Sequence, residues 1–148
     1  MSEGSLSSAN ARRLDEAVCT LHVCTSCRPK GCSREPRENR PGFILHQILT
    51  ELIKERGLVH RVNLQPAECL SLCARPCGIA LSSKDSWTYL FGDQDPNQTA
   101  EDILDCVSVY IESSRGNMPR ERRPKNLRAS ILGRVPPIIK SNQNHRRF

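Results

Sequence analysis

The sequence predicts an α/β fold in which four strands form a mixed sheet and two helices flank it. Three observations support this prediction. Short apolar segments alternate like half-buried strands, two other segments repeat apolar residues with a helical period, and their order is strand, helix, strand, strand, strand, helix. Nearly all of this signal falls within residues 17–114, a length that suits one compact domain.

The first strand and the first helix open the predicted domain. Residues 18–23 alternate apolar and polar side chains, which is the period-two pattern of a strand. A polar loop rich in arginine, proline and glycine follows at residues 28–42. The helix after it ends at Gly57, a suitable left-handed cap. Its apolar stripe consists of Leu45, Ile48, Leu49, Leu52 and Ile53.

Three more strands and a second helix complete the domain. A strand is expected at residues 59–64, and Pro66 stops it. Residues 78–81 and 87–91 read as two strands of a hairpin. The second helix, after Thr99, has a stripe of Ile103, Val107, Tyr110 and Ile111. A parallel crossover followed by an antiparallel hairpin is the thioredoxin-like layout.

Charge separates the ends of the chain from this domain. Residues 1–114 carry 12 Lys and Arg against 15 Asp and Glu, whereas residues 115–148 carry 10 against one. We expect residues 1–16, which are polar and serine-rich, to form a disordered leader. Residues 115–148 then form a basic, proline-containing tail, with a short helix near residues 126–132. Its apolar anchors on the domain would be Leu127, Ile131 and Ile138.

The basic tail and the absence of apolar runs bear on partners and location. A tail of this charge is either a solvated extension or a guide to an acidic partner protein, and a nucleic acid is the less favoured target. No stretch is apolar enough for an export signal or a membrane span, so we expect a cytoplasmic protein. In a reducing compartment, eight cysteines indicate metal ligands or redox thiols rather than disulfides.

Six of the eight cysteines gather in two segments, the first cysteine loop (residues 24–32) and the second cysteine loop (residues 69–77). Thiolate ligands need closely spaced, adaptable backbone so that several sulfurs converge at ~2.3 Å from a metal. Cys19 and Cys106 lie on apolar faces instead and are expected to pack as small hydrophobic residues. The loop cysteines are Cys24, Cys27, Cys32, Cys69, Cys73 and Cys77.

The spacing of these cysteines favours an iron–sulfur cluster over zinc. Zinc sites usually repeat the two-residue spacing in both halves, whereas the second cysteine loop repeats a three-residue spacing. A [2Fe–2S] cluster, with a pair of ligands from each loop, is therefore the leading hypothesis, and zinc is the alternative. Cys32 and Cys77 are further metal candidates: Cys32 would need more ordering of the polar loop to bind, and Cys77 would be a nearby thiol that tunes or exchanges at the site. The expected ligands are Cys24, Cys27, Cys69 and Cys73.

Two other functions use the same residues. Cys24 and Cys27 form a C-x-x-C pair between the first strand and the first helix, as in thiol–disulfide oxidoreductases. However, residues 28–42 separate this pair from the helix whose N-terminus would activate it. The third hypothesis is a zinc-stabilised interaction module whose basic tail docks on a partner. No other catalytic constellation is present, so we expect no catalysis by this chain.

Four motifs give the sequence a family resemblance. They are HVCTSCRPKG at residues 22–31, CLSLCARPC at 69–77, WTYLFGD at 87–93 and RVPP at 134–137. Together they resemble a bacterial family of uncharacterised, predicted metal-binding proteins, over nearly the whole chain after the leader.

A more distant resemblance is to thioredoxin-like [2Fe–2S] ferredoxins and the small subunit of respiratory NADH dehydrogenase. It implies that Cys24, Cys69 and Cys73 occupy three of the four cluster-ligand positions. Either Cys27 or Cys32 would fill the remaining position, and Cys77 has no counterpart. The implied function is an electron carrier or metal-binding accessory protein that meets a redox or metal-delivery partner.

Overall fold

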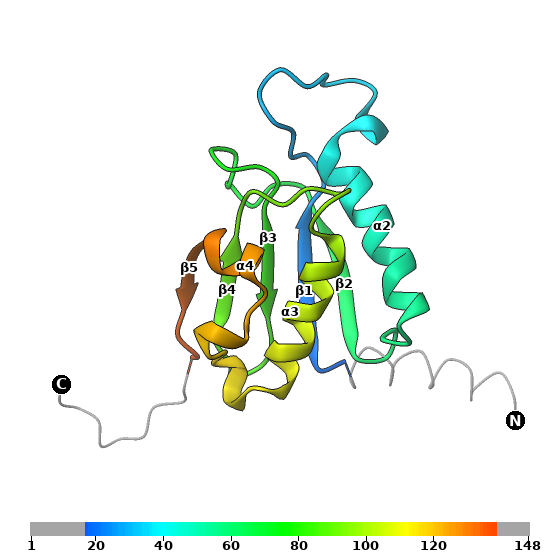
Figure 1. Cartoon of the computed structure of the whole chain (residues 1–148). Coiled ribbons are helices and arrows are strands. Elements are labelled where there is room, and N and C mark those ends of the chain that lie inside the picture. The colour runs from blue at the N-terminus through cyan, green and yellow to red at the C-terminus, as the bar shows by residue number, and fades with distance from the viewer. Residues whose placement is uncertain (1–16, 139–148) are drawn as a thin grey trace, which may run out of the picture.

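The computed structural model describes residues 17–138, so the expected leader at residues 1–16 and residues 139–148 lie outside it. A five-stranded sheet with the order β2-β1-β3-β4-β5 forms its centre (Figure 1). β1 and β2 are parallel, and all other neighbours are antiparallel. The strands are β1 (Cys19–Cys24), β2 (Val62–Ala67), β3 (Ile79–Ser82), β4 (Thr88–Phe91) and β5 (Ile131–Val135).

Alternation along the strands divides the sheet into an apolar face and a polar face. Leu21, Leu81 and Tyr89 lie beside one another on neighbouring strands and are almost fully buried. On the opposite face, Asn63 donates to the Thr20 hydroxyl at 3.4 Å, and both side chains are only half-buried. The core therefore lies between one face of the sheet and the helices.

Two long helices supply the other side of the core. In α2 (Pro41–Glu55) the expected stripe is buried through Leu45, Leu49 and Ile53, and Gly57 follows at φ +70° as the predicted cap. In α3 (Ala100–Glu112) the buried residues are Ala100, Ile103, Leu104, Cys106, Val107 and Tyr110. Tyr110 meets the Tyr89 ring edge-on at 6.0 Å between ring centroids, which joins α3 to the sheet.

The prediction of four strands and two helices is wrong at the C-terminal side. β5 adds a fifth strand beside β4. The third helix, α4 (Lys125–Ala129), lies where a short helix near residues 126–132 was expected, although residues 131 and 132 belong to β5. The sequence pattern missed β5 because its short apolar run lies in a stretch whose charge indicates solvent exposure. The 3₁₀ turns of the described chain are Arg37–Asn39, Ser114–Gly116 and Arg120–Arg122.

Residues 115–138, where the basic tail was expected to begin, pack on the domain. Leu127 is completely buried and Met118 is 4% exposed. Arg134 lies over the Trp87 ring at 3.9 Å from the ring centroid. Ile138, in contrast, is 87% exposed and anchors nothing. Within residues 17–138, no helix is long and apolar enough to cross a membrane.

Replacing Leu127 by alanine tests whether this segment belongs to the folded unit. We expect Leu127→Ala to lower the free energy of unfolding by about 3 kcal/mol, because it leaves a cavity in the core. Ile138→Ala is the matched control, since its side chain is exposed, and it should change stability by less than ~0.5 kcal/mol. Urea denaturation of both variants measures the difference, and equal effects would show that Leu127 contributes nothing to the core.

Candidate metal centre

The register of the sheet brings the two cysteine loops to one edge. β1 ends at Cys24, which lies beside Ala67, the last residue of β2. On the other side of β1, antiparallel pairing places Val23 beside Ile79, the first residue of β3. The chain leaving β1, the chain leaving β2 and the chain entering β3 therefore meet at this edge. The first of these is the first cysteine loop, and the other two are the ends of the second.

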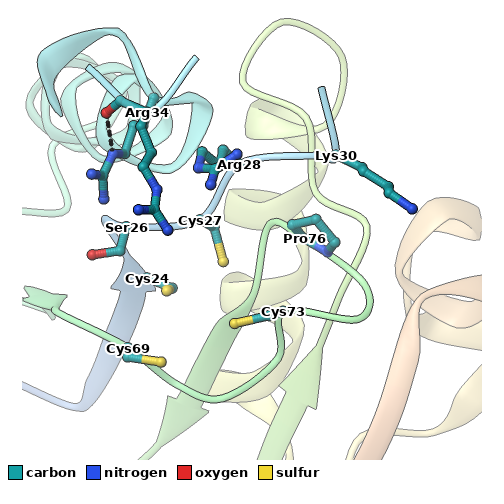
Figure 2. Close-up of a pocket in the computed structure, with 10 residues that line it drawn as sticks. Cys24, Ser26, Cys27, Arg28, Lys30, Arg34, Cys69, Cys73 and Pro76 are labelled. Carbon is teal, nitrogen blue, oxygen red and sulfur yellow. Dashed lines mark hydrogen bonds between the residues drawn. The ribbon is translucent and has the colours of Figure 1, made fainter. Parts of the chain in front are cut away.

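Four cysteines line a pocket of about 500 Å³ at this edge of the sheet. Cys24 and Cys27 come from the first cysteine loop, and Cys69 and Cys73 from the second (Figure 2). The fold thus brings together the four side chains that the sequence analysis selected as ligands. The remaining lining residues are Ser26, Arg28, Lys30, Arg34, Arg40 and Pro76.

The two pairs of cysteines differ in exposure. Cys24 is 1% exposed and Cys27 is 4% exposed, so the first pair forms the buried side of the pocket. Cys69 and Cys73 are both exposed and form its open side. A bound group would consequently be held from the protein interior and reached from solvent through the second pair.

Backbone hydrogen bonds fix the first pair. The Cys24 N–H donates to the Gly78 carbonyl oxygen at 3.1 Å, which extends the pairing with the chain before β3. The Gly42 N–H donates to the Cys27 carbonyl oxygen at 3.0 Å. A Cβ on Gly42 would overlap the Cys24 carbonyl oxygen and lie 3.1 Å from the Cys27 nitrogen. Only glycine therefore lets the first turn of α2 approach the first cysteine loop this closely.

The second cysteine loop is held by contacts to the chain after β4. The Arg75 guanidinium forms a two-pronged ion pair with Asp93, and the Asp93 N–H donates to the Arg75 carbonyl oxygen at 2.8 Å. Cys77 and Gln94 exchange backbone hydrogen bonds of 3.3 and 3.1 Å. The Gln94 amide also donates to the Ser130 hydroxyl at 3.0 Å, so the C-terminal segment supports this loop.

Backbone N–H groups point at one sulfur of each pair. The Gly78 N–H donates to Cys27 Sγ at 3.4 Å. The Ser71 N–H donates to Cys69 Sγ at 3.2 Å, from a residue with φ +59°. Such donors stabilise the charge of a thiolate. Hydrogen bonds to cysteine sulfur also influence the potential of an iron–sulfur cluster.

The acidities of the thiols follow from these surroundings. The Ser71 donors lower the pKa of Cys69. The charge of the Cys69 thiolate then raises the pKa of Cys73. Burial raises the pKa of Cys24, and a hydrogen bond with the Cys77 thiol, together with burial, raises that of Cys27. In the metal-free protein, Cys69 is therefore the thiol of this group that loses its proton most readily.

The pKa shifts indicate how the four thiols are coupled. Cys27 contributes to the raised pKa of Cys24, and Cys73 contributes to the lowered pKa of Cys69. The charge of Cys69 raises the pKa of Cys73 most, and the charges of Cys27 and Cys24 add to that shift. Among residues 17–138, no three His, Cys, Asp or Glu side chains converge as they would around a single metal ion. The arrangement is consequently two facing pairs.

The other four cysteines lie outside the pocket. Cys77 is 1% exposed and sits behind Cys27, with its Sγ 4.0 Å from the Cys27 carbonyl oxygen. Cys32 is exposed in the polar loop. Cys19 and Cys106 are buried in the core, which confirms their expected packing role, and burial raises the pKa of each to about 12.

The cationic side chains of the pocket were not predicted from the sequence. Residues 28–42 were interpreted only as a polar connection, yet four of their basic side chains line the cavity. Their closeness in sequence to the first cysteine pair is the signal that could have identified them. They are Arg28, Lys30, Arg34 and Arg40.

Comparisons with known proteins identify a family and a fold. A family profile described as "Protein of unknown function (DUF1636)" matches residues 21–137. No curated protein matches the sequence. A solved structure of a thioredoxin-like [2Fe-2S] ferredoxin from Aquifex aeolicus is 18% identical, with 83% of this chain and 98% of that chain covered and a TM-score of 0.50. The wild-type thioredoxin-like [2Fe-2S] ferredoxin from Aquifex aeolicus, in a second structure, is 19% identical, with coverages of 79% and 98% and a TM-score of 0.49.

These findings confirm two expectations. The matched profile confirms the resemblance to an uncharacterised family. The likeness with the TM-score of 0.50 bears on the fold alone, and it confirms the thioredoxin-like layout.

Replacing Gly42 by alanine tests the close approach of α2 to the first cysteine loop. The added methyl group would overlap backbone of Cys24, so we expect a loss of about 2 kcal/mol or more in unfolding free energy. Gly133→Ala is the matched control, because nothing lies within 4 Å of a Cβ there. Urea denaturation of both variants gives the comparison, and an unchanged stability in Gly42→Ala would contradict the contact.

Proposed function

This chain belongs to the DUF1636 family of proteins of unknown function, and we propose that it binds a [2Fe–2S] cluster through Cys24, Cys27, Cys69 and Cys73. It would act as an electron carrier or a metal-binding accessory protein without catalysis of its own. The observation that supports this proposal is that four cysteines from two separate loops line one pocket.

The chemistry of the pocket suits a soft, thiolate-bound metal group. All four candidate donors are sulfurs, and the pocket lining contains no Asp, Glu or His side chain. Hard cations such as Mg²⁺ and Ca²⁺ prefer oxygen ligands, whereas zinc and iron–sulfur clusters accept four thiolates. The donor set therefore fits either zinc or an iron–sulfur cluster.

The arrangement in pairs favours the cluster over a single zinc ion. A zinc ion needs all four sulfurs at ~2.3 Å from one point. A [2Fe–2S] cluster is larger and takes one pair of cysteines on each iron. One pair of pocket cysteines comes from each loop, 24/27 from the first and 69/73 from the second, which matches the second requirement better.

The surrounding residues would hold and tune such a group. When bound, a [2Fe–2S] cluster supplies a one-electron redox couple. Burial of Cys24 and Cys27 keeps water from one side of the pocket. The N–H groups of Ser71 and Gly78 donate to thiolate sulfur, and the four basic side chains of the lining oppose its negative charge. Both effects favour the reduced, more negative state.

The thiol–disulfide oxidoreductase hypothesis receives less support. The first turn of α2 does return to the C-x-x-C pair, since the Gly42 N–H donates to the Cys27 carbonyl oxygen at 3.0 Å. However, Cys24 and Cys27 are both at least 96% buried, and the pKa of each is raised. An attacking thiol in this enzyme class is accessible and has a lowered pKa.

Protein purified without oxygen tests the cofactor. We expect a reddish-brown solution with about two iron atoms and about two acid-labile sulfides per chain, which bleaches when dithionite reduces the cluster. Elemental analysis and visible absorption give the result. A colourless protein with one zinc ion per chain would overturn the electron-carrier proposal, and a metal-free protein with a readily reduced disulfide would favour the oxidoreductase.

Serine substitutions test the ligand set. We expect Cys27→Ser to lose most of the bound metal and its absorption, because serine removes a soft thiolate from the pocket lining. Cys32→Ser is the matched control, because this cysteine is exposed in the same loop but does not line the pocket, and it should keep both signals. The reverse outcome would make Cys32 the ligand and exclude Cys27.

A further inference from the structure

The cysteine pocket opens beneath an exposed cationic loop, formed by residues 28–40. Every residue from position 29 to position 39 is exposed. The loop contains five basic residues and two acidic ones, Glu35 and Glu38. Figure 2 shows several of the basic side chains above the sulfur atoms, with Lys30 extending away from them. Those that line the pocket are Arg28, Lys30, Arg34 and Arg40.

The basic side chains of this loop have no acidic partners in the described part of the chain. None of the ion pairs among residues 17–138 involves them. Arg28 donates to the Cys32 carbonyl oxygen at 3.0 Å, and Arg40 donates to the Arg34 carbonyl oxygen at 2.8 Å. These bonds shape the loop without neutralising its basic groups, and five basic against two acidic residues leave residues 28–40 with a net charge of +3.

The basic residues of the C-terminal segment are engaged differently. Arg122 pairs with Glu112 at 3.0 Å. Arg123 is 7% exposed, close to the Tyr89 ring, and Arg134 lies over Trp87. Moreover, β5 is the outermost strand of the sheet, and β3 and β4 separate it from β1. Arg122, Arg123 and Arg134 therefore stabilise the fold, while the basic groups of the loop at residues 28–40 lie beside the thiols.

We propose that the loop at residues 28–40 is the docking surface for an acidic patch of a partner protein. Docking there would bring the partner to Cys69 and Cys73, which are exposed on the same pocket. Whether an electron or a metal is transferred between the two proteins depends on the proposed function. The place and the charge of the contact rest on the loop itself.

The composition of the loop favours a protein over other anionic targets. Residues 28–40 contain no aromatic side chain on which the bases of a single-stranded nucleic acid could stack. They also contain no large aliphatic residue that could insert into a membrane surface. A compact patch of arginine and lysine beside a reactive centre fits carboxylates on a protein, which steer association and fix orientation.

Protection of the exposed thiols from alkylation tests the docking surface. Reduced, metal-free protein is treated at low salt with iodoacetamide, a neutral reagent, with and without poly-L-glutamate as the acidic probe. We expect the probe to slow alkylation of Cys69 and Cys73 about fivefold, measured by mass spectrometry. Rising salt should remove this protection, because the contact is electrostatic. The readout needs no bound metal, so it is independent of whether the protein holds iron or zinc.

Two double variants, each of which reverses two positive charges, locate the contact. Lys30→Glu with Arg34→Glu should reduce the protection to less than about 1.5-fold. Arg146→Glu with Arg147→Glu makes the same change of charge in the basic tail and should leave the protection within about a third of the wild-type value. Circular dichroism checks that both variants fold. Protection that survives the first pair, or that only the tail pair removes, would overturn the proposal.

Two further probes separate the classes of anion. An oligothymidylate and vesicles containing phosphatidylserine replace poly-L-glutamate at the same concentration of negative charge. We expect weaker protection from both. Stronger protection by either probe that depends on Lys30 and Arg34 would assign the loop to a nucleic acid or a membrane and contradict docking of a protein.

Discussion

The pairing of β1 between β2 and β3 is the constraint on which the cysteine site depends. Leu21 and Val23 are fully buried on the apolar face, and Cys24 follows them at the end of the strand. A slip of one residue would turn Leu21 and Val23 toward the polar face and would displace Cys24 from the Gly78 carbonyl oxygen. The hydrophobic core and the position of the first thiol are therefore set by the same register.

The second cysteine loop has no regular secondary structure and obtains its shape from the far side of the sheet. Gly92 and Gln94 contact Ser130 through hydrogen bonds of 2.9 and 3.0 Å. Gln94 in turn pairs with Cys77. This chain of contacts makes the C-terminal segment a support for the pocket, and the region that matches the family extends through it to residue 137. Because of this support, the backbone of the loop keeps its conformation while two of its thiols are exposed to solvent.

Periodicity predicted most of the fold because the core residues repeat along regular elements. The stripe of α2 and the alternation of β1 are visible in the sequence and buried in the structure. β5 was not predictable in the same way. In the sequence Arg134 indicates solvent exposure, and only the fold shows that its guanidinium lies over the Trp87 ring. The gathering of cysteines was visible as spacing, whereas the cationic lining required the fold. The hydrogen bond from Gly42 to Cys27 closes the intervening loop and sets its basic side chains beside the thiols.

The two cysteine pairs differ in exposure, so the pocket has a buried side and a side that is open to solvent. Cys24 and Cys27 are bound to the sheet edge and to the first turn of α2, so their positions change only if the core changes. Cys69 and Cys73 lie on a loop open to solvent, and Cys69 already has a lowered pKa. Metal binding requires deprotonated thiols. In the proposed metal-binding role, the exposed pair would therefore be the first to bind or release a metal group, and the buried pair would retain it. Exchange with a partner would accordingly take place from the side on which the cationic loop lies.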